Sequence, residues 1–99
     1  MASQTENMGQ VKDRIKEPSM YHVVMHNDDF TTMAFVVGIL MDIFGKKAST
    51  AERLMLQVHK EGQAIVGTYP YDIAVTLVRK ASERARQERF PFRMTVEEA

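Results

Sequence analysis

The chain contains no cysteine, and this absence removes several classes of function at once. Without cysteine there is no disulfide framework, no thiolate zinc site and no cysteine nucleophile. An excess of either charge is also missing, because 13 basic and 13 acidic residues give a formal net charge of zero. A neutral chain has no overall attraction toward nucleic acid or an anionic membrane. The composition therefore predicts a protein that binds neither.

Long apolar runs are absent as well. No stretch approaches the roughly 20 apolar residues that a membrane-spanning helix needs. The N-terminus shows no apolar segment typical of a secretory signal. Together with the missing cysteine, these features predict a protein of the reducing cytoplasm.

Methionine, by contrast, is frequent, with 8 residues in a chain of 99. Most of these methionines are expected to fill the core. A flexible thioether also suits a pocket that must adapt to several related side chains. The length itself predicts one domain with a real but thin core.

Residues 1–17 differ in composition from the rest of the chain. They are polar and mixed in charge, and Val11 and Ile15 are the only branched aliphatic residues there. Such a segment has too little apolar surface to build a packed element. The sequence therefore predicts a flexible N-terminal extension over 1–17 and a folded domain over 18–99.

Hydrophobic periodicity divides the folded part into six elements. Alternating apolar residues predict strands at 20–26, 63–69 and 92–97. Spacings of three and four predict three helices, which begin near Thr31 or Thr32, at Ser49 and at Pro70. The order β-α-α-β-α-β predicts an α+β fold: a single compact domain with three helices packed on one face of a small three-stranded antiparallel sheet.

Capping patterns in the sequence indicate where the three helices begin and end. Ser49-Thr50-Ala51-Glu52 has the pattern of a capping box at the start of the second helix, and Gly45 and Gly62 are placed to end the first and second. Pro70 fits the first turn of the third helix. The inward faces are expected to carry Leu54, Met55, Val58 and His59 on the second helix, and Ile73, Leu77, Val78, Ala81 and Ala85 on the third.

The stretch Asn27-Asp28-Asp29-Phe30-Thr31-Thr32-Met33 follows the first strand directly. Its oxygen acceptors stand at a strand exit, where side chains can converge on a ligand. About one helix later comes Leu54-Met55-Leu56-Gln57-Val58-His59. Together the two stretches predict a small apolar pocket with polar acceptors at its mouth, suited to a ligand that is apolar at one end and cationic at the other. The simpler interpretation, that Asn and Asp here form a turn and cap a helix, stays open.

Metal and catalytic interpretations find little support. The spaced carboxylates, glycine and terminal glutamate of a calcium loop are missing. His22 and His26 lie roughly 13 Å apart if the strand rises ~3.3 Å per residue, so they cannot share one ion. His59 has no recognisable nucleophile beside it, and a histidine on an apolar helix face is usually a core or boundary residue. The sequence predicts no metal, no cofactor and no enzymatic activity.

Five motifs taken in order resemble the ClpS family of bacterial and plastid adaptors. They are Pro-Ser-Met-Tyr (18–21), Asn-Asp-Asp-Phe-Thr-x-Met-x-Phe-Val (27–36), Met-Leu-x-Val-His (55–59), Gly-x-Ala-Ile (62–65) and Pro-Phe-x-Met-Thr-Val-Glu (91–97). Each motif is weak alone, but all five at the family's spacing are specific. The resemblance covers residues 18–99.

This resemblance implies a protease adaptor that breaks no bond itself. It would bind substrates whose first residue is Leu, Phe, Tyr or Trp (N-degrons) and pass them to a Clp-type AAA+ unfoldase, ClpA- or ClpC-like, and its peptidase. The extension 1–17 would engage the unfoldase during delivery.

The resemblance also implies a role for each site residue. Asn27, Asp28 and His59 would hydrogen-bond the substrate's α-ammonium and first peptide group, and Asp29 would support their loop. The residues that would line or border the side-chain pocket are Thr31, Met33, Val36, Met55, Val58 and Phe92, with Met33 as a gate at its entrance.

Some positions depart from the family pattern. Thr32 stands where proline is frequent, Ala34 where glutamate is frequent, and Phe92 where many relatives carry leucine. Val75 and Leu77 replace charged residues on a surface associated with unfoldase docking. Two other functions stay open: a module that docks on an AAA+ or ribosomal partner without reading N-termini, and an enzyme that uses Asp28 and His59 as an acid–base pair.

Overall fold

The computed structural model describes residues 19–99, and the predicted extension over 1–17 lies outside the described residues. The elements follow the predicted order, β-α-α-β-α-β. They are β1 (Met20–His26), α2 (Met33–Asp42), α3 (Ala48–Glu61), β2 (Gln63–Pro70), α4 (Tyr71–Gln87) and β3 (Arg93–Glu98). The fold prediction is confirmed.

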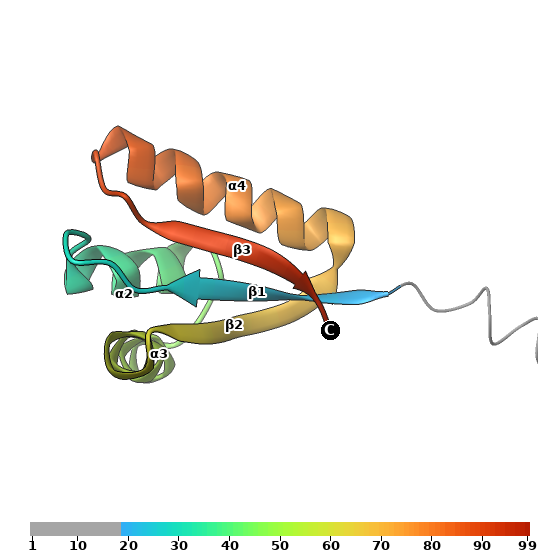
Figure 1. Cartoon of the computed structure of the whole chain (residues 1–99), viewed down its shortest axis with the longest axis horizontal. Helices are drawn as coiled ribbons and strands as arrows, with labels where there is room; N and C mark the ends of the chain where they lie inside the picture. Colours follow the sequence, from blue (N-terminus) through green and yellow to red (C-terminus); the bar gives the residue numbers. More distant parts are fainter. Residues whose placement is uncertain (1–18) are drawn as a thin grey trace, which may run out of the picture.

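The three strands form one antiparallel sheet in the order β2-β1-β3. Figure 1 shows β1 in the middle of the sheet, α4 along the side of β3, and α2 and α3 at the end where β1 finishes. His26, the last residue of β1, pairs with Gln63 on β2 and with Arg93 on β3. The chain therefore leaves β1 beside the starts of both neighbouring strands, and α3 leads directly into one of them.

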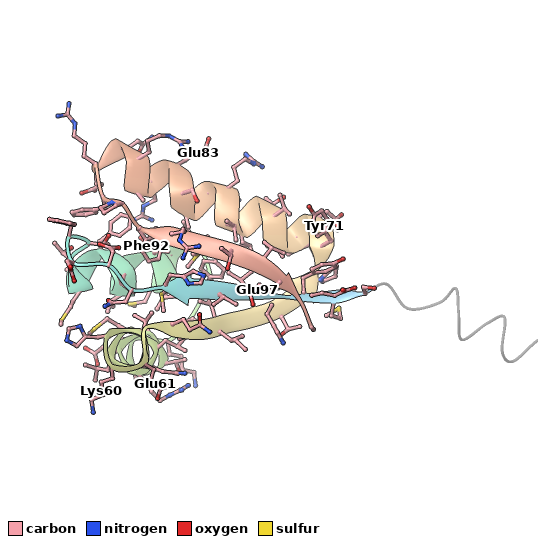
Figure 2. All side chains as sticks on the ribbon, viewed as in Figure 1. Lys60, Glu61, Tyr71, Glu83, Phe92 and Glu97 are labelled. Atoms are coloured by element: carbon pink, nitrogen blue, oxygen red, sulfur yellow. The ribbon has the colours of Figure 1, made fainter. Side chains whose placement is uncertain are left out.

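The core lies between the sheet and the helices. Its largest fully buried side chains come from β1 and α2, and they are Val23, Met25, Ile39 and Leu40. Apolar side chains of α3, β2, α4 and β3 join the same cluster. Charged side chains such as Lys60, Glu61 and Glu83 stand on the outer surface (Figure 2). A single contiguous core therefore fixes the positions of the two helices that flank the end of β1.

The inward face of α4 differs from the predicted one at its first position. Ile73 is 48% exposed, whereas Ala74 is fully buried together with Ala81 and Ala85. Spacings of seven and four place these three alanines on one side of the helix. Their small side chains let α4 lie close to the sheet, so the larger Ile73 is turned to the flank.

Two predictions of helix starts need correction. α3 begins at Ala48 with Lys47 in the N-cap position and no side-chain cap hydrogen bond, so the capping box predicted at Ser49 is wrong. Both Ser49 and Thr50 lie inside the helix. Pro70 is the last residue of β2 and the N-cap of α4 rather than part of its first turn. Both helices therefore begin without a side-chain cap hydrogen bond.

No helix within residues 19–99 is both long enough and apolar enough to cross a membrane.

Candidate functional site

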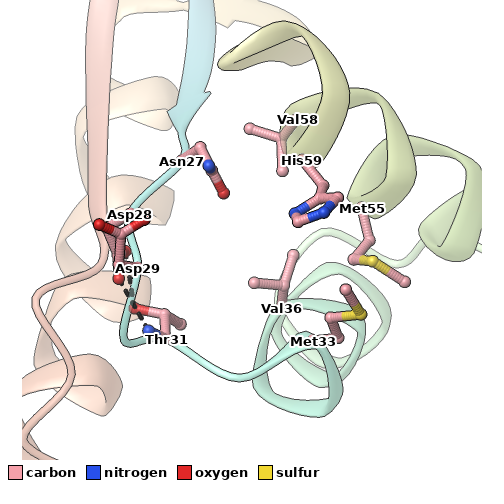
Figure 3. Close-up of a pocket in the computed structure, with 9 residues that line it drawn as sticks. All are labelled: Asn27, Asp28, Asp29, Thr31, Met33, Val36, Met55, Val58 and His59. Atoms are coloured by element: carbon pink, nitrogen blue, oxygen red, sulfur yellow. Dashed lines mark hydrogen bonds between the residues drawn. The ribbon is translucent and has the colours of Figure 1, made fainter.

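A pocket of about 250 Å³ opens where β1 ends, between the following loop and the helices α2 and α3. Ligand pockets for drug-sized molecules range over roughly 300–1,000 Å³, so this cavity has the size for a smaller group. Nine residues line it, and they are Asn27, Asp28, Asp29, Thr31, Met33, Val36, Met55, Val58 and His59 (Figure 3). All nine belong to the ten predicted site residues.

The pocket has two chemically different sides. Figure 3 shows Asn27, Asp28, Asp29 and Thr31 along the loop on one side. The other side is formed by α2 and α3, which contribute Met33, Val36, Met55, Val58 and His59. Oxygen acceptors therefore face a mainly apolar wall across the cavity.

The apolar wall has a buried base and an exposed rim. Val36 and Val58 are buried members of the core cluster, and Met55 packs partly buried against it. Met33 is half exposed. The two valines are thus held rigidly by the core, while the half-exposed Met33 has room to change rotamer.

Asp28 organises the loop that carries the acceptors. Its Oδ1 accepts hydrogen bonds from the backbone N–H groups of Phe30 (2.8 Å) and Thr31 (2.7 Å). Its Oδ2 accepts a third from the Thr31 hydroxyl (2.8 Å). This arrangement is an Asx turn extended by one side-chain contact. The simpler interpretation of Asp28 as a turn former is therefore correct, and it holds alongside the residue's position in the pocket.

These hydrogen bonds also hold Asp28 in its charged form. Partial burial alone raises the pKa of the carboxyl, but the hydrogen bonds from the Thr31 and Phe30 N–H groups and the Thr31 hydroxyl outweigh it. The pKa consequently lies below its ordinary value. A carboxylate offers about four lone-pair sites, and three are used within the loop. Asp28 therefore presents a negative charge and one unused acceptor position on Oδ2.

Thr32 fixes the start of α2 next to this loop. Its hydroxyl accepts a hydrogen bond from the N–H of Phe35 at 3.1 Å, as an N-cap does. The sequence left Thr31 and Thr32 as alternative caps, and the structure shows that the two threonines have different roles. Thr31 bonds to Asp28, and Thr32 caps the helix whose first residue is Met33.

A backbone hydrogen bond joins the loop to α3. The N–H of Asn27 donates to the carbonyl of Gly62 (2.9 Å), and the N–H of Gly62 donates to the carbonyl of Val58 (2.9 Å). Gly62 ends α3 in the left-handed conformation with φ of 90°, which other residues rarely adopt. These two bonds hold the last turn of α3, and with it His59, beside the end of β1. Sequence reasoning identified Gly62 as a helix stop but missed its role as the acceptor for Asn27.

Two predicted positions differ in the structure. His59 lies at the pocket but is exposed, so its assignment to the inward face of the helix is wrong. Phe92 does not line the pocket. It is only 8% exposed and packs edge-on against Phe35, with ring centroids 5.8 Å apart. Phe90 takes a similar position on the same ring at 5.0 Å, so Phe92 belongs to an aromatic core cluster.

The two histidines of β1 bond to different strands. His22 Nδ1 lies 2.9 Å from the Thr68 hydroxyl on β2, and His26 Nε2 lies 2.8 Å from the Thr95 hydroxyl on β3. Burial and the neighbouring Arg93 guanidinium lower the pKa of His26 against an opposing effect of Glu97. Within residues 19–99 no group of three or more candidate ligands is placed to hold a metal ion.

The geometry of the pocket suits a small group with an apolar body and a polar, hydrogen-bond-donating end. Comparison with known proteins agrees with this class. The family model described as "ATP-dependent Clp protease adaptor protein ClpS" matches residues 16–95. The chain belongs to the ClpS family of Clp protease adaptors. Since members of this family are adaptors, the prediction that the protein is not an enzyme is confirmed.

Individual relatives extend over most of the chain. The ClpS adapter protein of Syntrophus aciditrophicus is 49% identical over 87 residues, which cover 88% of this chain and 81% of that protein. The ClpS adapter protein of Clostridium acetobutylicum is 43% identical over 93 residues, covering 94% and 91%. The structure of Agrobacterium tumefaciens ClpS2 bound to L-phenylalaninamide matches with a TM-score of 0.82 and 32% identity. It covers 84% of this chain and 100% of that one.

The three hydrogen bonds to Asp28 predict a pH-dependent contribution to stability. Because its pKa is lowered in the folded protein, Asp28 stabilises the fold above the ordinary value of 3.8, and this contribution is lost as the pH falls through the lowered pKa. Asp28→Asn should therefore be less stable than the wild type at pH 7, with the difference shrinking as the pH falls below this value of 3.8. Urea unfolding at a series of pH values measures both curves.

Asp29→Asn is the matched control. It removes the same charge from a neighbouring residue that takes no part in these hydrogen bonds. If Asp28→Asn and wild type give parallel stability curves from neutral to acidic pH, the loop hydrogen bonds do not hold the carboxylate as described.

Proposed function

We propose that this adaptor recognises protein substrates by their first residue. It binds N-terminal Leu, Phe, Tyr or Trp and delivers the substrate to a Clp-type AAA+ unfoldase and its peptidase. The observation that carries the proposal is the pairing, in one small pocket, of an apolar cavity with a row of acceptors at its mouth. An N-terminal residue with a large apolar side chain has the complementary chemistry at both ends.

The cavity accounts for the side-chain part of the ligand. Its volume of about 250 Å³ suits one side chain rather than a longer segment. The buried Val36 and Val58 offer a preformed apolar surface. Full burial of a large apolar side chain contributes roughly 1.5–3 kcal/mol. On this account the side chain of the substrate's first residue enters the cavity between α2 and α3.

The acceptors account for the α-ammonium, which carries three donors and a positive charge. Asn27 offers a side-chain carbonyl oxygen, Asp28 its remaining lone pair and its charge, and His59 a ring nitrogen in its neutral form. A hydrogen bond to a charged group contributes roughly 1.5–3 kcal/mol. The carboxylate is held in place by the loop before any ligand arrives, so little ordering is needed on binding.

Neither contribution alone gives useful affinity. A dissociation constant of 1 mM already corresponds to about 4.1 kcal/mol, and association has its own entropic cost. The two contributions together amount to roughly 3–6 kcal/mol, a range that extends above this value, whereas either contribution alone, at most about 3 kcal/mol, falls short of it. The site should therefore require a free amino group and a large apolar side chain on the same residue.

The comparisons support the same ligand class. L-phenylalaninamide, which is bound in the Agrobacterium tumefaciens structure, combines a free amine with an aromatic side chain. Delivery rests on family membership and on the resemblance alone. The ClpA- or ClpC-like identity of the unfoldase, the part played by residues 1–17 and the cytoplasmic location all stay predictions. Val75 on α4 is exposed, and Leu77 is partly exposed, so both lie on the surface that the resemblance associates with unfoldase docking.

The requirement for a free amine gives the first test. A fluorescent peptide that begins with Phe should bind, and the same peptide with an acetylated amine should bind at least tenfold more weakly, because it loses charge and donors. Asp28→Asn should lower the affinity for the free peptide by a similar factor, about 1.4 kcal/mol. Fluorescence anisotropy titrations measure all of these affinities.

Asp72→Asn is the matched control, since it removes one exposed carboxylate at the start of α4, away from the pocket. It should bind the free peptide as the wild type does. Equal binding of free and acetylated peptides would disprove recognition of the N-terminus and leave a docking module as the better description.

Met33 generates a second prediction, about selectivity. It is half exposed at the pocket mouth and begins α2. A first residue branched at Cβ, such as Ile or Val, carries its bulk beside the ammonium and must pass this side chain. Met33→Ala should admit Ile and Val, while Leu and Phe still bind.

Affinities for four peptides that differ only in the first residue (Leu, Phe, Ile or Val) measure this selectivity. Met41→Ala is the control, because Met41 is similarly exposed on the same helix but does not line the pocket. The gate assignment is wrong if wild type binds Ile as well as Leu, or if Met33→Ala still excludes Ile and Val.

A further inference from the structure

The methionines of the described region fall into three groups by exposure and position. Met25 and Met94 are buried in the core, at 0% and 6% exposure. Met20 and Met41 are each 41% exposed and lie outside the pocket. Met33, at 50%, is the most exposed of the methionines within residues 19–99, and it lines the pocket together with the partly buried Met55.

Figure 3 shows the two pocket methionines on the same side of the cavity, opposite the polar loop. Both residues therefore belong to the wall that the proposed function assigns to an apolar side chain. An exposed thioether is also the part of this surface that an oxidant can modify. In this fold, the methionine with the largest exposed fraction among residues 19–99 lines the pocket and does not lie in the core.

We propose that Met33 and Met55 form an oxidation-sensitive site that turns off binding at the pocket. The proposal rests on the proposed function, because it assigns a regulation to the same pocket. The oxidant is a peroxide. A sulfur lone pair forms a new S–O bond as the O–O bond of hydrogen peroxide breaks. The sulfur is oxidised by two electrons to a sulfoxide, and the peroxide is reduced to one water molecule.

The sulfoxide changes the pocket in a defined way. It adds a strongly polar oxygen to a wall that, apart from the His59 ring at its edge, is formed by the apolar side chains of Met33, Val36, Met55 and Val58. Burying that oxygen against an apolar side chain without a hydrogen bond is unfavourable. The stiffer, polar side chain also loses the adaptability of the thioether. Binding of a large apolar first residue is therefore weakened, whereas the acceptors on the opposite loop are unchanged.

The fold should survive this modification. Met25 and Met94 are enclosed by the core, so mild oxidation reaches the pocket methionines before it reaches them. Val36 and Val58, which form the base of the cavity, contain no oxidisable group. Because methionine sulfoxide is reduced back to the thioether by sulfoxide reductases, the loss of binding is reversible.

The test uses graded hydrogen peroxide on the whole chain, with three readouts on each sample. Peptide mass spectrometry gives the extent of oxidation at each methionine, anisotropy gives the affinity for a Phe-initiated peptide, and circular dichroism gives the melting temperature. Wild type should show Met33 oxidised before Met25 and Met94. Its affinity should fall at least tenfold as Met33 and Met55 are oxidised, with no loss of fold, and sulfoxide reductase treatment should restore it.

Two double variants separate the pocket from the rest of the surface. Met33→Leu/Met55→Leu retains apolar side chains of similar size and removes both pocket sulfurs. Met20→Leu/Met41→Leu removes two exposed sulfurs outside the pocket. Each variant's affinity after peroxide is compared with its own affinity before it. The pocket double variant should stay within twofold, and the surface double variant should lose affinity as wild type does.

Three outcomes overturn the proposal. The first is unchanged affinity of wild type in which Met33 and Met55 are fully oxidised. The second is an equal loss of affinity in the pocket double variant, which places the sensitive group elsewhere. The third is loss of binding only together with unfolding. Failure of the untreated wild type to bind the peptide is a separate result, which overturns the proposed function and this regulation with it.

Discussion

The hydrogen bond from the Asn27 N–H to the Gly62 carbonyl is the contact on which the pocket depends most. It joins the end of β1 to the end of α3, two segments about 35 positions apart in the sequence, and so brings the polar loop opposite Val58 and His59. The geometry requires glycine, because the residue adopts φ of 90° while its own N–H closes the last turn of the helix. The next pair of residues, His26 on β1 and Gln63 on β2, are partners in the sheet, so the contact between Asn27 and Gly62 directly extends the pairing of these two strands.

Asp28 shows how the loop can be rigid without being buried in the core. Its carboxylate replaces the missing backbone partners of Phe30 and Thr31, and the same interactions keep it ionised. Thr32 then starts α2 at once, so that Met33 and Val36 reach the pocket from a fixed direction. The charge that the proposed function offers to a ligand and the structure of the loop thus both depend on the Asp28 side chain. Such preorganisation lowers the ordering cost of binding.

Much of this arrangement was predictable from the sequence, for physical reasons that can be named. The bounds of β1 and the end of α3 at Gly62 follow from local sequence patterns. Nine of the ten predicted site residues line the pocket, and they were predicted from the five motifs taken together. The wrong predictions concern positions where tertiary packing, rather than the local sequence pattern, determines where a helix begins or which side chain is buried. Ser49 does not cap α3, Ile73 yields the inward face to Ala74, and Phe92 joins the aromatic cluster around Phe35. A helix pattern also could not show that His59 sits at an exposed pocket edge.

The most direct test of the central claim is a crystal structure of this chain with L-phenylalaninamide. The account predicts that the phenyl ring enters the cavity against Val36 and Val58. It also predicts that the ammonium lies within hydrogen-bond distance of the side-chain oxygens of Asn27 and Asp28, with the Asp28 hydrogen bonds to Phe30 and Thr31 intact. A ligand bound outside this cavity, or one with its ring in the cavity and its ammonium turned away from the loop toward solvent, contradicts the account.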